Sequence, residues 1–313
     1  FFTQGYDATT LDAVAERLGA DLARPPIAVG VTHCERALQT LLTSFDPTNG
    51  GFGGAPKFPQ VVNIAFLQDA RAMMSNPGVS SEAGQTVAAI DRVLKSTLDA
   101  MAIGGIHDQL GGGFHRYSVD ATWTVPHFEK MLYDQAQLMA VYARASVAYD
   151  DGYYAQVARG IGAYLRREMT DSATGLFFTA QDAEVAGREG LNYTWSLDEI
   201  NGVFGSDEAS AKLAATMYGA DVASGGPNFQ DPHHPNLPAR SVLRLAARPE
   251  SLAVRHRMQP AEFAASKATI DQALFAHRAT REQAATDDKL LTAWNAQMIG
   301  ALATAAVLLN DPQ

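Results

Sequence analysis

Helical periodicity is the feature of this chain that most constrains its fold. Apolar residues recur three and four positions apart, which places them on one face of an α-helix. The segments with this pattern are 34–45, 61–74, 83–101, 130–149, 153–169, 261–277 and 294–308. Successive helices of this kind bury their apolar faces by packing in pairs, as in an α-hairpin toroid. We therefore expect an all-α fold built from helical hairpins.

The loops between these helices are long and carry the unusual residues. They span 46–59, 103–126, 171–195 and 219–238. Short strand-like runs lie within or just after them, at 176–179, 193–195 and 242–245. Loops of this length are uncommon in a compact domain unless they have a function. The sequence thus predicts short β insertions in long loops that hold the functional residues.

Composition excludes several classes of protein. The chain has 313 residues, of which 47% are hydrophobic and 19% charged, as in ordinary globular domains. Its longest apolar run, at 299–309, is shorter than a spanning helix, and no secretory signal opens the sequence, so we expect a cytoplasmic protein without a membrane partner. A net charge of -10 argues against nucleic acid as a partner. The single cysteine, Cys34, cannot form an internal disulfide.

One segment, 104–134, concentrates groups capable of chemistry. Three successive glycines at 111–113 permit positive φ and close backbone approach, as a loop shaped around a ligand requires. Around them stand histidines, acids, an arginine and five aromatic rings: His107, His115, His127, Asp108, Asp120, Glu129, Asp134, Arg116, Phe114, Tyr117, Trp123, Phe128 and Tyr133. We expect this segment to form the wall of a pocket.

Five motifs give the chain a family resemblance. They are GGFGGAPKFP at 50–59, GGIHDQLGGGFHRYSVDATWTVPHFEKMLYDQAQL at 104–138, GLFFTAQDAE at 175–184, EGLNYTW at 189–195 and DDKLLTAWNAQMIGALA at 287–303. With these motifs the chain resembles the spermatogenesis-associated protein 20 family over about residues 33 to 310. The resemblance implies a thioredoxin-like domain followed by a six-hairpin-glycosidase-like (α/α) toroid.

The resemblance also shapes the expected domain organisation. No Cys-x-x-Cys is present, so the family's thioredoxin-like domain is expected to be missing or reduced. We expect residues 1–32 to be a linker or the remnant of a preceding domain. Residues 33–313 are then the N-terminal part of a toroid that is incomplete. Helices 261–277 and 294–308 should accordingly leave apolar faces uncovered.

Carboxylates offer the first chemistry, because toroids of this kind commonly act on sugars and glycoside hydrolysis needs an acid and a base or nucleophile. The leading candidate is Asp108, which precedes the glycine-rich loop; its alternative role is to cap a turn. The second candidate is Asp287 or Asp288, one of which is expected to cap the following helix while the other stays free. For Asp134, a structural hydrogen bond is the favoured role.

Histidines offer a second chemistry, because sugar 2-epimerisation removes a proton beside a carbonyl and returns it on the other face. The candidates are His107, His115 and His127, each of which could instead be a buried structural imidazole. A metal site made of His107, His115 and Glu129 lacks the spacing of known zinc motifs. We therefore predict no metal and no cofactor.

Other residues of the motifs are candidates for substrate binding. Aromatic rings suit sugar faces, although packing between helices is an alternative role for each tryptophan. Arg116 could clamp an anion or pair with Asp120 or Glu129. The full predicted set is Lys57, Arg116, Tyr117, Trp123, His127, Glu129, Asp182, Trp195 and Trp294.

Together these features predict a carbohydrate-active enzyme, glycosidase-like or a sugar isomerase or epimerase, with a small carbohydrate as its ligand. A different class remains open: a non-catalytic scaffold that works with a thioredoxin-like domain. An enzyme should bring Asp108, His115 and Asp287 or Asp288 to one open cavity. A scaffold should tie these groups into ion pairs.

Overall fold

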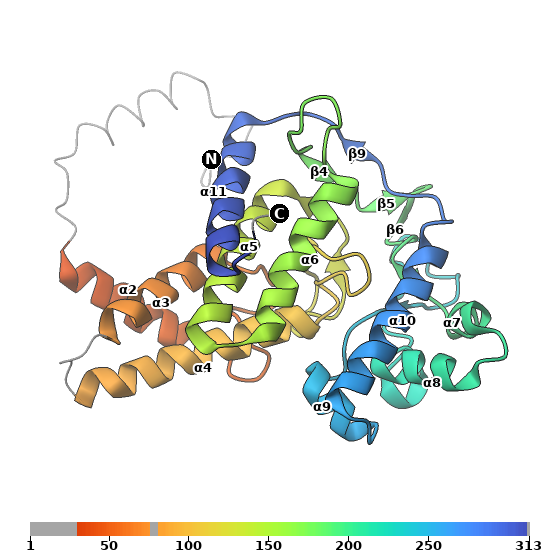
Figure 1. Cartoon of the computed structure of the whole chain (residues 1–313), viewed down its shortest axis with the longest axis horizontal. Helices are drawn as coiled ribbons and strands as arrows, with labels where there is room; N and C mark the ends of the chain where they lie inside the picture. Colours follow the sequence, from red (N-terminus) through yellow and green to blue (C-terminus); the bar gives the residue numbers. More distant parts are fainter. Residues whose placement is uncertain (1–29, 76–80, 312–313) are drawn as a thin grey trace. The chain divides into compact units, whose positions relative to one another are not determined.

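The computed structural model describes residues 30–75 and 81–311 (Figure 1). Contacts divide the chain into two units, 1–40 and 41–313. The linker expected at 1–32 lies outside the described residues except for its last three positions. The first described helix, α2, spans Val31–Ser44.

Helices make up most of the structure. They are α3 (Val61–Met74), α4 (Ser81–Ile103), α5 (Leu132–Tyr149), α6 (Gly152–Glu168), α7 (Leu197–Phe204), α8 (Glu208–Met217), α9 (Pro249–Arg255), α10 (Pro260–Arg278) and α11 (Thr292–Leu308), with a 3-10 turn at Val222–Ser224. Each of the seven predicted helices is present. The periodicity did not predict α7, α8 and α9, which are only seven to ten residues long.

The helices pack as neighbours in sequence. α3 packs against α4, α5 against α6, α7 against α8 and α9 against α10. Between the pairs, α5 also contacts α3 and α11, and Figure 1 shows α11 beside α5. Only Asp150 and Asp151 connect α5 to α6, and the Asp151 carboxylate caps α6 by accepting from the Tyr153 amide. The predicted all-α class, with helical hairpins and short β insertions, is confirmed.

Short strands lie in the long loops. β1 (Tyr117–Ser118) pairs with β2 (Pro126–His127), β5 (Glu184–Val185) with β6 (Arg188–Glu189), and β7 (Thr194–Trp195) with β8 (Ser241–Val242). The strand-like runs at 193–195 and 242–245 thus pair with each other. The run at 176–179 forms only one isolated bridge, Thr170 with Phe177.

A three-stranded antiparallel sheet brings distant motifs together. It has the order β3-β4-β9, where β3 is Lys130–Met131, β4 is Ala180–Gln181 and β9 is Thr286–Asp287. β3 leads directly into α5, and β9 ends five residues before α11. The sheet therefore fixes the N-terminal ends of two helices that pack against each other.

Of the two helices expected to leave apolar faces uncovered, α10 and α11, only α11 does so. In α11, Ile299 and Val307 are 60% and 79% exposed. In α10, the large apolar residues Phe263, Ile270 and Leu274 are buried. The expectation therefore holds for α11 and is wrong for α10. Within 30–75 and 81–311, no helix is both long and apolar enough to cross a bilayer.

Candidate active site

The glycine-rich loop is packed tightly against α6. Gly112 has φ +76°, and a Cβ there would collide with the carbonyl oxygen of Gly160 on α6. A Cβ at Gly111 would likewise collide with the guanidinium of Arg278 at the end of α10. Glycine is needed at both positions because backbone and a charged side chain occupy the space. The loop therefore joins α6 to α10.

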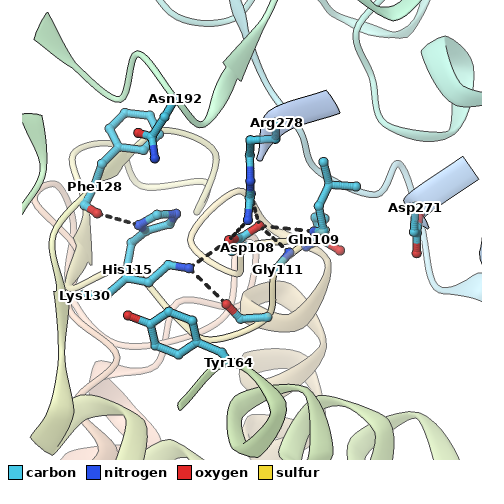
Figure 2. Close-up of polar contacts among 12 residues, drawn as sticks. Asp108, Gln109, Gly111, His115, Phe128, Lys130, Tyr164, Asn192, Asp271 and Arg278 are labelled. Carbon is cyan, nitrogen blue, oxygen red and sulfur yellow. Dashed lines mark hydrogen bonds and ion pairs between the residues drawn. The ribbon is translucent and has the colours of Figure 1, made fainter. Parts of the chain in front are cut away.

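Asp108 lies at the centre of this junction (Figure 2). Its Oδ1 accepts from Arg278 Nη1 at 2.7 Å and from the amides of Leu110 and Gly111 at 3.1 and 2.9 Å. Its Oδ2 accepts from Arg278 Nη2 at 2.9 Å and from Lys130 Nζ at 2.8 Å. All three charged side chains are buried. We call Asp108, Lys130 and Arg278 the buried ionic centre.

The electrostatics of this centre keep Asp108 ionised. Burial alone would raise its pKa, but the charges and hydrogen bonds of Arg278 and Lys130 lower it well below the usual value. A carboxylate with five donors has no proton to give at neutral pH, so the geometry favours the alternative weighed for Asp108, a turn-capping and structural role. The sequence missed Lys130 and Arg278, since no local pattern links Asp108 to a residue 170 positions away.

His115 and His107 are held beside this centre as neutral imidazoles. His115 Nδ1 lies 2.8 Å from the carbonyl oxygen of Phe128, and His107 Nδ1 lies 3.1 Å from that of Ala102, so each Nδ1 carries the proton that makes this bond. Burial is the main cause that lowers the pKa of His115 to about 3 and that of His107 to about 4. Neither group exchanges protons readily near neutral pH.

Two cavities adjoin the loop. One of about 20 Å³ is lined by His107, Asp108, His115, Tyr193 and Arg278 among others, and it has room for about one water. A second of about 470 Å³ is lined by residues 107–112 together with side chains of α6 and α10. His107 and Asp108 thus line a pocket wall as expected. Arg116 is not among the lining residues of either cavity.

Arg116 belongs to a second polar centre, which surrounds His127. His127 Nδ1 lies 2.7 Å from Glu189 Oε1, and its Nε2 lies 3.8 Å from Glu129 Oε2. Arg116 Nη1 donates to the same Glu129 oxygen at 2.8 Å. The hydrogen bond to Glu189 is the main cause that raises the pKa of His127. The His127 side chain is 29% exposed and can therefore be reached from solvent.

Carboxylates from three strands share one face beside this centre. In the β3-β4-β9 sheet, Met131 is paired with Ala180, and Ala180 with Asp287. Because side chains alternate along a strand, Glu129 and Asp182, one position beyond the paired Lys130 and Gln181, point to the same face as Asp287. Asp287 binds the ammonium of Lys289 at 2.9 Å and is partly exposed. This face gathers three residues that the sequence predicted separately.

Aromatic rings border the same region. Tyr117 stacks between Phe58, with ring centroids 4.7 Å apart, and His127, at 5.1 Å. Trp294, in the first turn of α11, meets Tyr133 of α5 edge to face at 4.8 Å. We call Arg116, Tyr117, His127, Glu129 and Glu189 the His127 site.

Three residues predicted to bind substrate belong to the core instead. Lys57 has no exposed side chain and donates to Asp46 at 2.6 Å and to the Ala121 carbonyl at 3.1 Å. Trp123 is fully buried and donates to the Asn49 carbonyl at 3.0 Å. Trp195 is also fully buried, with the Arg281 guanidinium 3.9 Å from its ring. Their predicted contact with substrate is therefore corrected to a packing role.

The expected arrangement of the acids before α11 is also corrected. The residue that caps α11 is Leu291, without a side-chain hydrogen bond, so neither Asp287 nor Asp288 is the cap. Asp288 is exposed and Asp287 pairs with Lys289. Neither acid lines the two cavities that adjoin Asp108. Over the described ranges, no three His, Cys, Asp or Glu side chains are grouped so as to hold a metal ion.

Solved structures with a related arrangement include sugar-converting enzymes. A sugar epimerase from a ruminal bacterium matches 90% of this chain and 82% of its own, at 13% identity and a TM-score of 0.35. The cellobiose 2-epimerase of Spirochaeta thermophila matches 97% of this chain and all of its own, at 13% identity and a TM-score of 0.37. Because the identities and TM-scores are this low, the fold is described from the helices and strands of this chain alone.

Relatives by sequence are much closer. No protein-family model matches the chain. Spermatogenesis-associated protein 20 of Mus musculus is 35% identical over 310 residues, which is 92% of this chain and 38% of the relative. The Homo sapiens protein of that name is 35% identical over 317 residues, 97% of this chain and 39% of the relative. The chain thus spans about two fifths of the length of these relatives. Over that stretch it matches spermatogenesis-associated protein 20.

Proposed function

We propose that the His127 site is the active site of a carbohydrate-active enzyme that moves a proton on an open-chain sugar, as a sugar isomerase or epimerase does. The observation that carries this proposal is the pairing of His127 with Glu189 at 2.7 Å in a partly exposed position. Hydrogen bonding of Nδ1 to a carboxylate fixes the tautomer, which leaves the Nε2 lone pair free to accept a proton. In its neutral form, such an imidazole can act as a general base.

The surroundings of His127 suit a sugar ligand. Tyr117 holds the His127 ring by stacking on it, and Trp294 lies at the neighbouring helix end as an aromatic candidate for contact with a sugar. Glu129 and Asp182 offer acceptors for hydroxyl groups, while Arg116 offers donors beside a carbonyl oxygen. Charge on that oxygen grows when the adjacent carbon loses its proton, so a guanidinium placed there stabilises the transition state.

The test is solvent deuterium exchange at the carbon beside the carbonyl. The 313-residue chain is incubated in deuterated buffer with a panel of aldoses and ketoses, and proton NMR follows exchange and interconversion. His127→Gln should lower the rate about 10² to 10⁴-fold, because the general base is lost. His233→Gln, in an exposed loop, is the matched control and should keep the wild-type rate.

One observation favours the scaffold as a second candidate. Asp108 is tied to Lys130 and Arg278, as expected for a non-catalytic protein in which these groups serve stability. A scaffold would show no exchange with any sugar, and no change of melting temperature on sugar addition. Release of a second sugar from disaccharides without exchange would instead favour a glycosidase. For either function, we propose a thioredoxin-like domain as partner and a cytoplasmic location.

A further inference from the structure

Asp134 is an acid that lies beside the His127 site, within electrostatic reach of Arg116 and Glu129. It lies in the first turn of α5, next to Tyr133, and its side chain is partly buried. Its Oδ2 is buried and accepts no hydrogen bond from any described residue. A buried carboxylate oxygen without a donor costs free energy, and such atoms are rare in native proteins unless they have a function. The hydrogen bond expected for Asp134 from the sequence is therefore absent at this oxygen.

The cation nearest Asp134 is already engaged elsewhere. Arg116 forms its 2.8 Å ion pair with Glu129, and no ion pair joins it to Asp134 among the described contacts. Burial is the main cause that raises the pKa of Asp134 to about 7, and the charge of Glu129 adds to the rise while Arg116 opposes it. Two carboxyl groups that share one cation commonly separate into a neutral acid and an anion, and this separation marks acid and base roles.

We infer that Asp134 is the proton donor of the His127 site. This inference rests on the proposed function. When His127 Nε2 takes the proton from the carbon beside the carbonyl, the C–H electron pair forms a carbon–carbon double bond. The carbonyl π pair moves to oxygen, which takes the Asp134 proton. Arg116 then stabilises the new Asp134 carboxylate. Return of the two protons, on either face or at the neighbouring carbon, regenerates both side chains and completes the reaction.

The inference is tested on the whole chain with Asp134→Asn, Asp134→Glu and the control Glu282→Gln, an exposed acid outside the site. Asp134→Asn should lower kcat about 10² to 10⁴-fold with little change of KM, because the amide cannot give up a proton. Asp134→Glu should recover part of the rate, and Glu282→Gln all of it. In the wild type, the alkaline fall of kcat reports the donor and should disappear in Asp134→Asn.

A stability measurement checks the state of Asp134 independently of activity. Its pKa is about 7 folded against 3.8 for the ordinary group, so the stability it contributes is present below pH 3.8 and is lost as the pH rises to about 7. Asp134→Asn should therefore gain stability relative to wild type over that interval. A constant difference with pH would overturn the inference. If Asp134→Asn exchanges deuterium at the wild-type rate, the inference fails and the proposed function stands. If the wild type shows no exchange, both fail.

Discussion

Glu189 controls the proton affinity of His127 through one hydrogen bond. The 2.7 Å contact raises the pKa of His127, so Glu189→Gln should lower that pKa. Because a general base acts only when unprotonated, the acid limb of kcat/KM should move to lower pH in the variant. The measurement is the pH dependence of kcat/KM for sugar interconversion, with Glu184→Gln on the partner strand β5 as control. An unmoved acid limb would show that His127 is not the base.

At the same scale, the sequence predicted some residues well and others poorly. Arg116, His127 and Glu129 lie within 14 positions, and the structure brings them into one centre through the β1-β2 hairpin. Residue type alone could not separate them from Asp108 and His115 of the same motif. The difference is burial: Asp108 meets Arg278 from a helix far along the chain, and local patterns carry no signal for such a pair.

At the scale of elements, the buried ionic centre joins the glycine-rich loop and β3 to the end of α10. Asp108→Asn would leave Arg278 and Lys130 buried with little compensation, and removal of one partner from a buried pair costs about 3 to 5 kcal/mol. A turn cap alone would cost about 1 kcal/mol, since asparagine still accepts one hydrogen bond.

Urea unfolding of the variant beside wild type decides between these values. Asp288→Asn, on an exposed side chain, is the control and should change stability by less than about 0.5 kcal/mol. A loss near 1 kcal/mol would reduce Asp108 to a capping residue. Full stability together with lost sugar conversion would restore Asp108 as a catalytic candidate.

The long helices could be predicted from the sequence, whereas the short helices could not. The seven periodic segments appear as helices, and all of them except α2 pack against another helix. α7, α8 and α9 are too short for periodicity to stand out, although Ser196 and Glu199 form a capping box at the start of α7 that could have marked it. The β3-β4-β9 sheet was not predictable, since its two-residue strands acquire their partners only through the packing of α5 and α11.

At the scale of the whole molecule, buried histidines set the response to acid. His115 and His107 have pKa values of about 3 and about 4 when folded, against 6.5 for an ordinary imidazole. The unfolded chain therefore binds protons that the folded chain does not, and their contribution to stability is present above pH 6.5 and lost as the pH falls toward 3 to 4. The lowered pKa of Asp108 extends the loss to lower pH. Asp134 acts in the opposite direction.

His115→Asn isolates this effect, because the amide can still donate to the Phe128 carbonyl but cannot be protonated. The variant should be less stable than wild type near neutral pH, since it leaves part of the imidazole volume empty. The difference in unfolding free energy should shrink as the pH falls below about 6.5. Only the wild type then loses stability, because its His115 is protonated in the unfolded chain and stays neutral in the folded protein. Unfolding free energies from urea titrations at several pH values measure it, with His233→Asn on the exposed loop as control. A difference that stays constant from neutral to acid pH would show that His115 is protonated in the folded protein as readily as in the unfolded chain.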